Sequence, residues 1–330
     1  MPTILAKVIR NDRVESLHRG HIAISDGTGK SIIAIGDPTF RTYIRSAAKP
    51  FQIMPLLNDG VDRHFAFTDR ELAVIIASHN GEAFHIEAVE SLLKKTGLEV
   101  DRLQCAFHPP LHGPTAKKQY LQDAPKTPLV NNCSGKHSGM LAVAKFHGWP
   151  LETYLQPEHP VQKRILQVIS RFSNLPEDDI GIGMDGCSAP VFYLPVTNMA
   201  LMYASLAAGK IELSERVFDV MVTNPEMIAG TDRFDTKLMQ VTRGRMVSKV
   251  GAEGVRCVGV RGERALGIAL KVEDGSKRAS ETIMLEVLWQ LDLISQEEVN
   301  KLSKYRKPMI ANHAGIETGW VEPAFILERS

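Results

Sequence analysis

The chain has 330 residues, of which 39 are basic and 38 are acidic. This length allows a large core in one or two domains. The balanced charge, without blocks of like charge, argues against a nucleic acid or an anionic membrane as partner and favours a small polar substrate. Neither a long apolar run nor a basic leader with an apolar stretch is present, so we expect a soluble, cytoplasmic protein.

The first elements along the chain are predicted to be antiparallel strands. Apolar and polar residues alternate over residues 4–35, and the run Asp26-Gly27-Thr28-Gly29 is typical of a turn between two strands.

The middle of the chain is predicted to be mostly helical. A helix over residues 50–57 is expected to begin close to Ser46, because Pro50 is tolerated only near a helix start. Helix-like composition, amphipathic spacing and terminal glycines predict further helices. These cover residues 69–77, 87–95, 135–147, 161–172, 196–209 and 214–224.

The last third is predicted to return to strands at residues 245–250, 255–260 and 266–272, followed by a helix over 280–291. The residues after Pro308 are expected to form an irregular packed tail. We therefore predict an α/β protein of the α+β type, in which residues 1–330 form a single domain with two lobes. The lobes are an antiparallel-sheet lobe, about 1–45 and 237–330, and a helical lobe, about 46–236.

Three short motifs carry the chemistry. Ser46-Ala47-Ala48-Lys49 matches S-x-x-K, Ser78-His79-Asn80 matches S-x-N, and Lys249-Val250-Gly251 matches K-x-G. In this order they are used by enzymes that attack an amide carbonyl with a lysine-activated serine.

The spacing of the first motif suits that chemistry. Residues three apart share one helix face, so the Lys49 amine is within reach of the Ser46 hydroxyl. Burial and a helix N-terminus both favour the neutral amine that a lysine base requires. The alternative is that Ser46 only caps a helix and that Lys49 is solvated.

A second group of residues could bind a metal. Cys133 precedes a predicted helix, where the pKa of a thiol is lowered, and Cys187 lies in another glycine-containing polar segment. Two thiolates and a nitrogen would form a zinc site with one open position. On chemical grounds His137 is the nitrogen ligand. The alternative is that both cysteines are buried thiols without a metal.

Taken together, S-A-A-K-P, A-S-H-N-G-E, N-N-C-S-G-K-H-S-G-M, M-D-G-C-S-A-P and K-V-G-A-E-G-V resemble the Rhizobium etli-type L-asparaginases, the asparaginase II family. The resemblance covers nearly the whole chain. It implies a fold similar to serine β-lactamases and penicillin-binding proteins, with hydrolysis of L-asparagine to L-aspartate and ammonia. It also implies a homodimer.

The same resemblance assigns roles to individual residues. It implies two catalytic serine–lysine pairs, a zinc site, and contacts to the substrate. The pairs are Ser46 with Lys49 and Ser78 with Lys249; the zinc ligands are Cys133, Lys136 and Cys187; and the substrate contacts are His137 and Asp185. Arg45, Asn80, Glu82 and Ala252 are further candidate contacts to the substrate.

Several alternatives remain open from the sequence. Lys271 could replace Lys249 as the partner of Ser78, and His137 could replace Lys136 as the nitrogen ligand of the metal. A glutaminase or another serine–lysine amidohydrolase would use the same machinery, because one methylene changes discrimination by only about 1–3 kcal/mol. A non-catalytic zinc-binding protein is the remaining function class.

Overall fold

The computed structural model describes residues 1–328 and divides the chain into two compact units. We call Met1–Ala47, Leu194–Ala208 and Lys237–Ser330 the sheet unit, and Ala48–Tyr193 with Gly209–Thr236 the helical unit.

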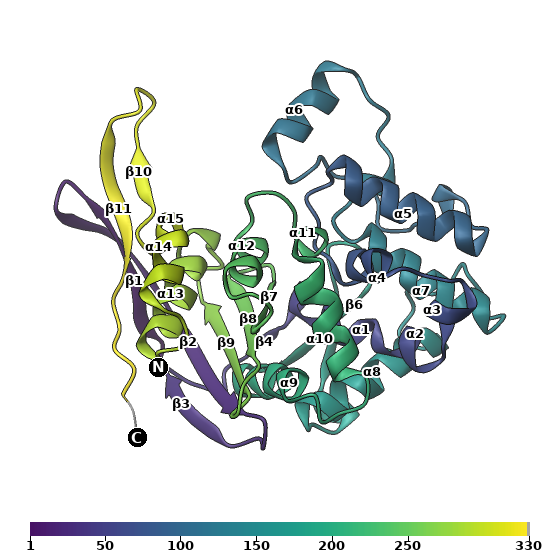
Figure 1. The fold of residues 1–330 in the computed structure, drawn as a ribbon, viewed down its shortest axis with the longest axis horizontal. Helices are drawn as coiled ribbons and strands as arrows, with labels where there is room; N and C mark the ends of the chain where they lie inside the picture. The colour runs from purple at the N-terminus through teal and green to yellow at the C-terminus, as the bar shows by residue number, and fades with distance from the viewer. Residues whose placement is uncertain (329–330) are drawn as a thin grey trace. The chain divides into compact units, whose positions relative to one another are not determined.

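The sheet unit is built on an antiparallel sheet with strand order β10-β11-β1-β2-β9-β8-β7, and β3 pairs with β2 (Figure 1). The strands of this sheet are β1 (Thr3–Arg10), β2 (Arg13–Asp26), β3 (Ser31–Ile35), β7 (Met246–Val250), β8 (Val255–Val260), β9 (Leu266–Val272), β10 (Met309–Ala311) and β11 (Glu317–Pro323). The short strand β4 (Arg41–Tyr43) lies in the sheet unit but outside this sheet. The helices of the sheet unit are α9 (Val196–Ala208), α13 (Lys277–Gln290), α14 (Gln296–Lys301) and α15 (Ser303–Arg306).

Pairing between the two ends of the chain creates this sheet. Strand β2 pairs with β9 in the register Ile22↔Leu270 and Ile24↔Ile268, and β1 pairs with β11. The predicted antiparallel sheet from N- and C-terminal segments, flanked by helices, is therefore confirmed. The residues after Pro308 differ from the expected irregular tail, because Met309–Ala311 and Glu317–Pro323 extend the sheet as β10 and β11.

Helix α9 belongs to the sheet unit, whereas the sequence placed it in a helical lobe over 46–236. It packs against β2, β8 and β9, while α13 packs against β1, β8, β9 and β11. Most of α9 is apolar and buried, so it needs a large apolar surface, and the inner strands supply one.

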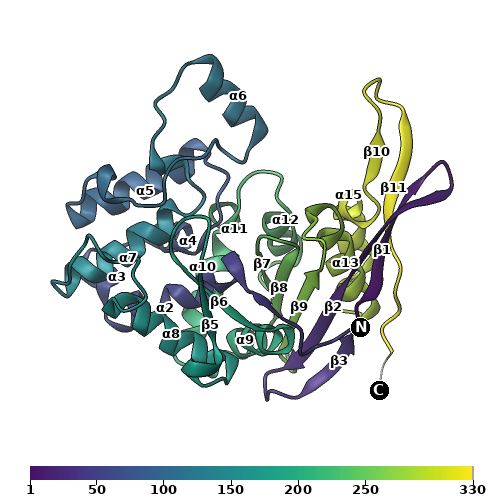
Figure 2. The same cartoon turned by 180° about the vertical axis from the view of Figure 1, so that it is seen from behind.

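The helical unit contains short helices and a small strand pair, β5 (Gly181–Met184) with β6 (Pro190–Pro195), visible from behind in Figure 2. Its helices are α1 (Lys49–Gln52), α2 (Met54–Asn58), α3 (Val61–His64), α4 (Asp69–Ile76), α5 (Ala83–Thr96), α6 (Gly113–Leu121), α7 (Ser134–Phe146), α8 (Pro160–Ser173), α10 (Ser214–Thr223) and α11 (Pro225–Ile228). Helix α12 (Phe234–Val241) and the 3₁₀ helix η1 (Arg45–Ala48) each cross a boundary between the units.

The helix predicted over residues 50–57 is divided in two. Helix α1 ends at Gln52 and α2 begins at Met54, with Pro55 in its first turn. Because proline has no N–H and clashes with the carbonyl four residues earlier, Pro55 favours a new helix start over continuation of α1.

Helix α7 lies very close to α4 at Gly135. A Cβ atom at this position would lie 2.0 Å from the carbonyl oxygen of Val74. Only glycine allows this approach, which holds the start of α7 against the end of α4.

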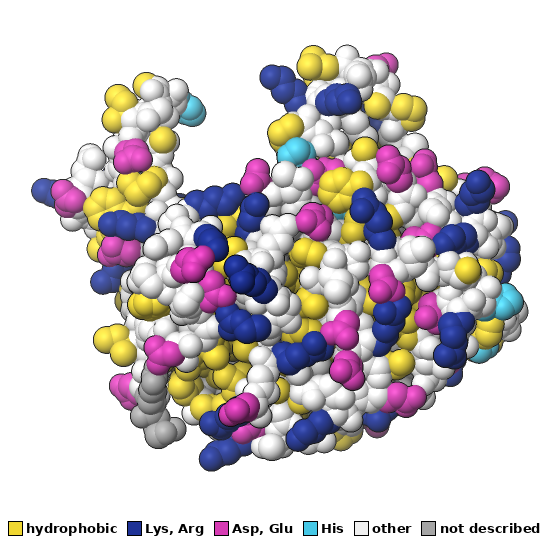
Figure 3. Space-filling model, viewed as in Figure 1, with side chains coloured by type: hydrophobic (Ala, Val, Ile, Leu, Met, Phe, Trp, Pro, Cys, Tyr) yellow, Lys and Arg dark blue, Asp and Glu magenta, His cyan; other side chains and the backbone are white. Residues whose placement is uncertain are grey.

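Two observations concern the whole described chain. Within residues 1–328, no helix is long and apolar enough to cross a bilayer. On the face drawn in Figure 3, basic and acidic side chains are intermixed, in agreement with the balanced composition.

Candidate functional site

Lys49 lies at the start of α1 with only 1% of its surface exposed. Its Nζ donates hydrogen bonds to Ala77 O at 2.5 Å, to Ser78 Oγ at 3.1 Å and to Asn132 O at 3.1 Å. All three acceptors are uncharged. The sequence paired Lys49 with Ser46 only, whereas the structure hydrogen-bonds it directly to the serine of the second motif.

Ser78 is held in place by the end of α4. Thr68 and Glu71 form a reciprocal capping box at the start of this helix, and the chain leaves the helix in an extended conformation at Ala77. The Ser78 N–H then donates to Ile228 O at 3.0 Å, at the end of α11. This bond fixes the main chain at Ser78, directly beside the hydroxyl that contacts Lys49.

Asn80 and Glu82 form a buried polar cluster beyond Ser78. Asn80 Nδ2 donates to Glu82 Oε2 and to Thr231 O, while Arg233 Nη1 donates to Asn80 Oδ1 at 2.9 Å. Thr231 N donates to Glu82 Oε2 at 2.8 Å. Burial opposes ionisation of Glu82, but the hydrogen bonds from Thr231 and Asn80 lower the pKa of this carboxyl from its usual value. The cluster thus presents a carboxylate and a guanidinium together.

His79 supports the same loop from inside. Its Nδ1 accepts from Gly81 N at 3.1 Å, so its Nε2–H donates to Ser134 Oγ at 2.9 Å. Burial, with the nearby His85 and Lys49, lowers the pKa of His79 well below its usual value. The imidazole is therefore neutral and links the Ser78 loop to the first turn of α7.

In the sheet unit, the first and third motifs approach each other through their backbones. Ser46 lies half-buried on η1, next to Arg45, whose φ is +53°. A Cβ atom at Gly251 would lie only 2.8 Å from Ile44 O. The turn after β7 therefore packs tightly against the segment that leads into Ser46.

Lys249 is fully buried on β7, and its Nζ donates to Val250 O at 3.3 Å. Ala252 lies in the following turn, where Gly251 N–H donates to Val255 O at 2.9 Å. The Gly251 N–H is therefore engaged in a main-chain hydrogen bond within the turn.

Lys271, the alternative to Lys249, lies on β9. Its Nζ donates to the main-chain oxygen of Glu253, and burial lowers its pKa. Both lysine amines bond a main-chain oxygen, so these contacts do not separate the two candidates, and the pairing of Lys249 with Ser78 stays a prediction.

The candidate metal residues gather in the helical unit. Cys133 caps α7, Lys136 lies in its first turn, and Lys136 Nζ is 3.1 Å from Cys187 Sγ. The hydrogen bond from Cys133, together with the Lys136 charge, lowers the pKa of Cys187 to about 4. From the sequence we expected a lowered pKa for Cys133. In the structure, the hydrogen bond from Cys133 to Cys187 and the burial of Cys133 raise that pKa to about 12.

A lysine amine must be neutral to bind a metal, whereas the surroundings of Lys136 favour its protonated form. Burial favours the neutral form, but the charges of Cys187 and Asp185 outweigh it and raise the pKa of Lys136. Without a metal, Lys136 and Cys187 therefore form an ammonium–thiolate pair. A metal that binds here has to displace the Lys136 proton.

His137, the other nitrogen candidate, is fully buried beside this pair. Its Nδ1 lies 2.6 Å from the Tyr154 hydroxyl, and within residues 1–328 its Nε2 has no hydrogen-bond partner. Burial and the Lys136 charge lower its pKa to about 3, so the ring is neutral. An unpaired buried nitrogen fits a contact to a bound group.

The donor set fits zinc only if a residue outside the usual ligand types takes part. Among the described residues, no group of three His, Cys, Asp or Glu side chains is arranged to hold a metal ion. Two sulfurs and the Lys136 amine do gather, and two thiolates with one nitrogen donor are a composition that zinc accepts. Asp185 lies in the turn between β5 and β6, two residues before Cys187.

Several residues of this site were missed from the sequence. They come from loops and from the first turn of α7, which meet only after folding, and they are Thr231, Arg233, His79, Ser134 and the main-chain oxygen of Asn132. His79 lies inside the S-x-N motif and could have been singled out. Arg233 lies 153 positions from Asn80, and no pattern in the sequence connects the two.

Comparisons with known proteins place the chain in a family. The sequence model of the L-asparaginase II family matches residues 6–323. A search of curated proteins gave no match. A crystal structure of Mglu in its glutamate form is similar at 17% identity and a TM-score of 0.41, covering 83% of this chain and 61% of that chain. A Bacillus glutaminase crystallised in the presence of 4.3 M NaCl is similar at 11% identity and a TM-score of 0.46, covering 83% and 91%.

Proposed function

The chain belongs to the L-asparaginase II family, and from this premise we propose that it is an amidohydrolase whose substrate is L-asparagine. The observation that carries the proposal is the buried hydrogen bond between Lys49 Nζ and Ser78 Oγ. It places a lysine against a motif serine, with only uncharged oxygens around the amine. That arrangement allows a proton to move between the amine and a serine hydroxyl.

In the proposed mechanism, Lys49 first loses one of the three protons that it donates in the structure. The neutral amine then accepts the hydroxyl proton of Ser46 while Ser46 Oγ attacks the side-chain carbonyl carbon of asparagine. The C–N bond breaks, the proton passes to the leaving nitrogen, and ammonia departs from an aspartyl ester on Ser46. Water then hydrolyses this ester to aspartate. Ser78, hydrogen-bonded to Lys49, relays protons in both steps with Lys249.

The nucleophile is tested by trapping the ester. The protein is quenched in acid during turnover of L-asparagine, and peptide mass mapping locates the aspartyl adduct. We expect the adduct on the peptide that contains Ser46. An adduct on Ser78 would assign the attack to the serine that Lys49 contacts and would overturn this part of the mechanism.

Ammonia release from the Ser46→Ala and Lys49→Met variants tests the same assignment. Both are expected to lose most activity, because one lacks the nucleophile and the other its base. Ser170→Ala, a serine on α8 that plays no part in the mechanism, is the matched control. Activity close to that of the parent in either motif variant would contradict the mechanism.

Glutamine is the competing substrate. The same catalytic residues would act on either amide, and the two substrates differ by one methylene, so discrimination is expected to be about 10–200-fold. We propose that kcat/KM is higher for L-asparagine, and a direct comparison on the purified protein decides it. A higher value for L-glutamine would identify a glutaminase and leave the serine–lysine chemistry intact.

We also propose that Cys133, Lys136 and Cys187 hold a zinc ion. A zinc ion supplies a Lewis-acidic positive charge that orients the α-amino and α-carboxylate groups of a substrate. His137 and Asp185 lie close to these residues along the chain and are the proposed contacts to the substrate, with Arg45, Asn80, Glu82 and Ala252.

Zinc content measured after purification without chelator tests the metal proposal. We expect about one equivalent in the parent and much less in Cys133→Ala, with Cys105→Ala as the control thiol variant. Removal of the metal is expected to raise KM more than it lowers kcat. Zinc near zero in the parent would exclude the site.

A further inference from the structure

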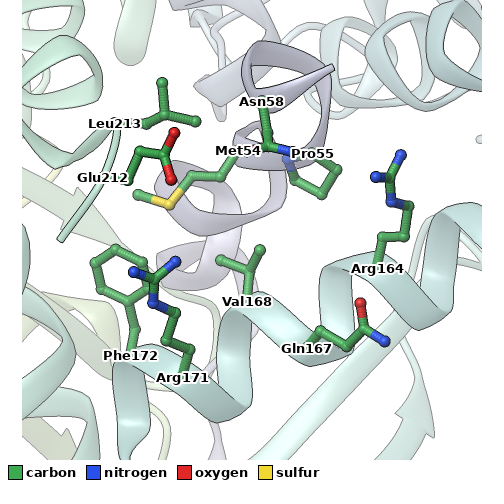
Figure 4. A pocket seen from close by; sticks show the side chains of 10 residues that line it. All are labelled: Met54, Pro55, Asn58, Arg164, Gln167, Val168, Arg171, Phe172, Glu212 and Leu213. Carbon is green, nitrogen blue, oxygen red and sulfur yellow. The ribbon is translucent and has the colours of Figure 1, made fainter.

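A second pocket lies in the helical unit, lined by side chains that the proposed mechanism does not use (Figure 4). Its volume is about 210 Å³, and it is bordered by α2, α8 and the segment that enters α10. The lining residues are Met54, Pro55, Asn58, Arg164, Gln167, Val168, Arg171, Phe172, Glu212 and Leu213. This volume is below the roughly 300–1,000 Å³ of sites for drug-sized ligands, so it suits a molecule of amino-acid size.

The pocket has an apolar wall. Met54 from α2 and Val168 and Phe172 from α8 face it, and Leu213 closes one side. Met54 and Phe172 are already buried, whereas Val168 and Leu213 are partly exposed, so a ligand that covers Val168 and Leu213 would remove apolar surface from water.

Two side chains of opposite charge line the same pocket and do not form an ion pair with each other. Figure 4 shows the Arg171 guanidinium and the Glu212 carboxylate at the same end of the pocket, on different segments. Within residues 1–328, neither side chain makes a hydrogen bond or an ion pair with any other residue. Arg164, at the other end, is instead ion-paired with Asp59 and contacts His147.

We propose that this pocket binds a free α-amino acid with an apolar side chain. The ligand carboxylate would pair with Arg171 and its ammonium group with Glu212, while its side chain would cover Val168 and Leu213. A guanidinium binds a carboxylate through two parallel hydrogen bonds, which gives the ligand a defined orientation.

The pocket also adjoins the helix that carries Lys49. Met54 and Pro55 begin α2, directly after α1, whose first residue is Lys49, and α8 packs against both helices. Because a ligand that binds only the folded state stabilises it, occupancy is expected to raise the melting temperature of the protein.

L-Leucine and L-methionine are the probes, because neither contains a carboxamide that the proposed reaction could consume. Binding is measured by titration calorimetry and by the shift in melting temperature. We expect saturable binding with a Kd on the order of 1 mM or tighter. Isocaproate, which lacks the amine, and isoamylamine, which lacks the carboxylate, are each expected to bind at least about tenfold more weakly.

Two charge-neutralising variants locate the site. Arg171→Gln and Glu212→Gln replace exposed side chains and are each expected to weaken leucine binding at least about tenfold. Lys163→Gln, on an exposed position of α8 outside the pocket, is the matched control and is expected to bind like the parent. The melting temperature without ligand verifies that each variant is folded.

Three outcomes would overturn the proposal. They are the absence of binding by both amino acids, binding that Arg171→Gln and Glu212→Gln leave unchanged, and binding of isocaproate as tight as that of leucine. None of them depends on hydrolysis, so failure here is distinguishable from failure of the proposed function.

Discussion

At the residue scale, the contact between Lys49 and Ser78 is a feature of the structure that the sequence motifs did not predict. Two separate serine–lysine pairs were expected, but the amine of the first pair donates to the hydroxyl of the second. Ser78 therefore both orients Lys49 and lies on the route by which protons would leave it.

We predict that Ser78→Ala lowers kcat for amide hydrolysis by roughly 10²–10⁴-fold, the usual contribution of a general acid–base group. KM is expected to change much less, because the hydroxyl acts on the catalytic lysine. Steady-state ammonia release checks this, with Ser170→Ala as control. A loss below about tenfold would show that Lys49 works without Ser78.

His85 makes stability depend on pH. It is fully buried, it lies beside His79, and its Nε2–H donates to Glu226 O at 3.1 Å. Burial lowers its pKa from 6.5 to about 4. As the pH falls from 6.5 towards 4, the unfolded chain binds a proton that the folded chain does not. The free energy of unfolding therefore decreases across this window.

We predict that His85→Gln, which keeps a donor without titrating, reduces the stability difference between pH 7 and pH 5. The reduction is expected to be up to about 2 kcal/mol, from one proton over about 1.5 pH units. Urea unfolding of both proteins at the two pH values measures it. Equal pH dependence in the two proteins would contradict the neutral buried imidazole.

At the element scale, the crossing of α7 over α4 supports both groups of residues in the helical unit. Helix α4 ends just before Ser78, and the first turn of α7 carries Lys136 and His137. Their close approach at Gly135 thus positions the Ser78 loop and the thiol cluster together.

We predict that Gly135→Ala destabilises the protein by about 1–3 kcal/mol, because its methyl group would overlap the Val74 carbonyl and force the helices apart. Gly113→Ala, in α6, has no atom within 4 Å of the new Cβ and is the matched control. Urea midpoints compare the two variants. Equal midpoints would mean that α4 and α7 separate without cost.

At the scale of the whole molecule, the oligomeric state is a prediction that rests on the family resemblance. We predict a homodimer, with twice the 36.5 kDa mass of one chain. Light scattering coupled to size-exclusion chromatography measures the mass directly. A single species at the monomer mass, unchanged with concentration, would contradict it.

Much of the fold was predictable because local patterns reflect the periodicity of strands and helices. The alternation in residues 4–35 and the short runs after Arg245 predicted the strands that pair as β2 and β9. Strand β11 was missed, since its sequence around Gly319 and Trp320 lacks regular alternation and it is defined by pairing with β1. Helix α9 was predicted, but its place against the sheet was not.

The sequence alone determined the family and predicted the reaction class, because its motifs place serine, lysine, asparagine and glycine at spacings that amide chemistry requires. Tertiary structure decided which groups touch. Lys49 and Ser78 are 29 positions apart, and Arg233 and Asn80 are 153 apart. The charge states of Cys133 and Cys187 likewise depend on which thiol donates and which lies beside Lys136. Such properties arise from burial and contact, which a linear order of residues does not contain.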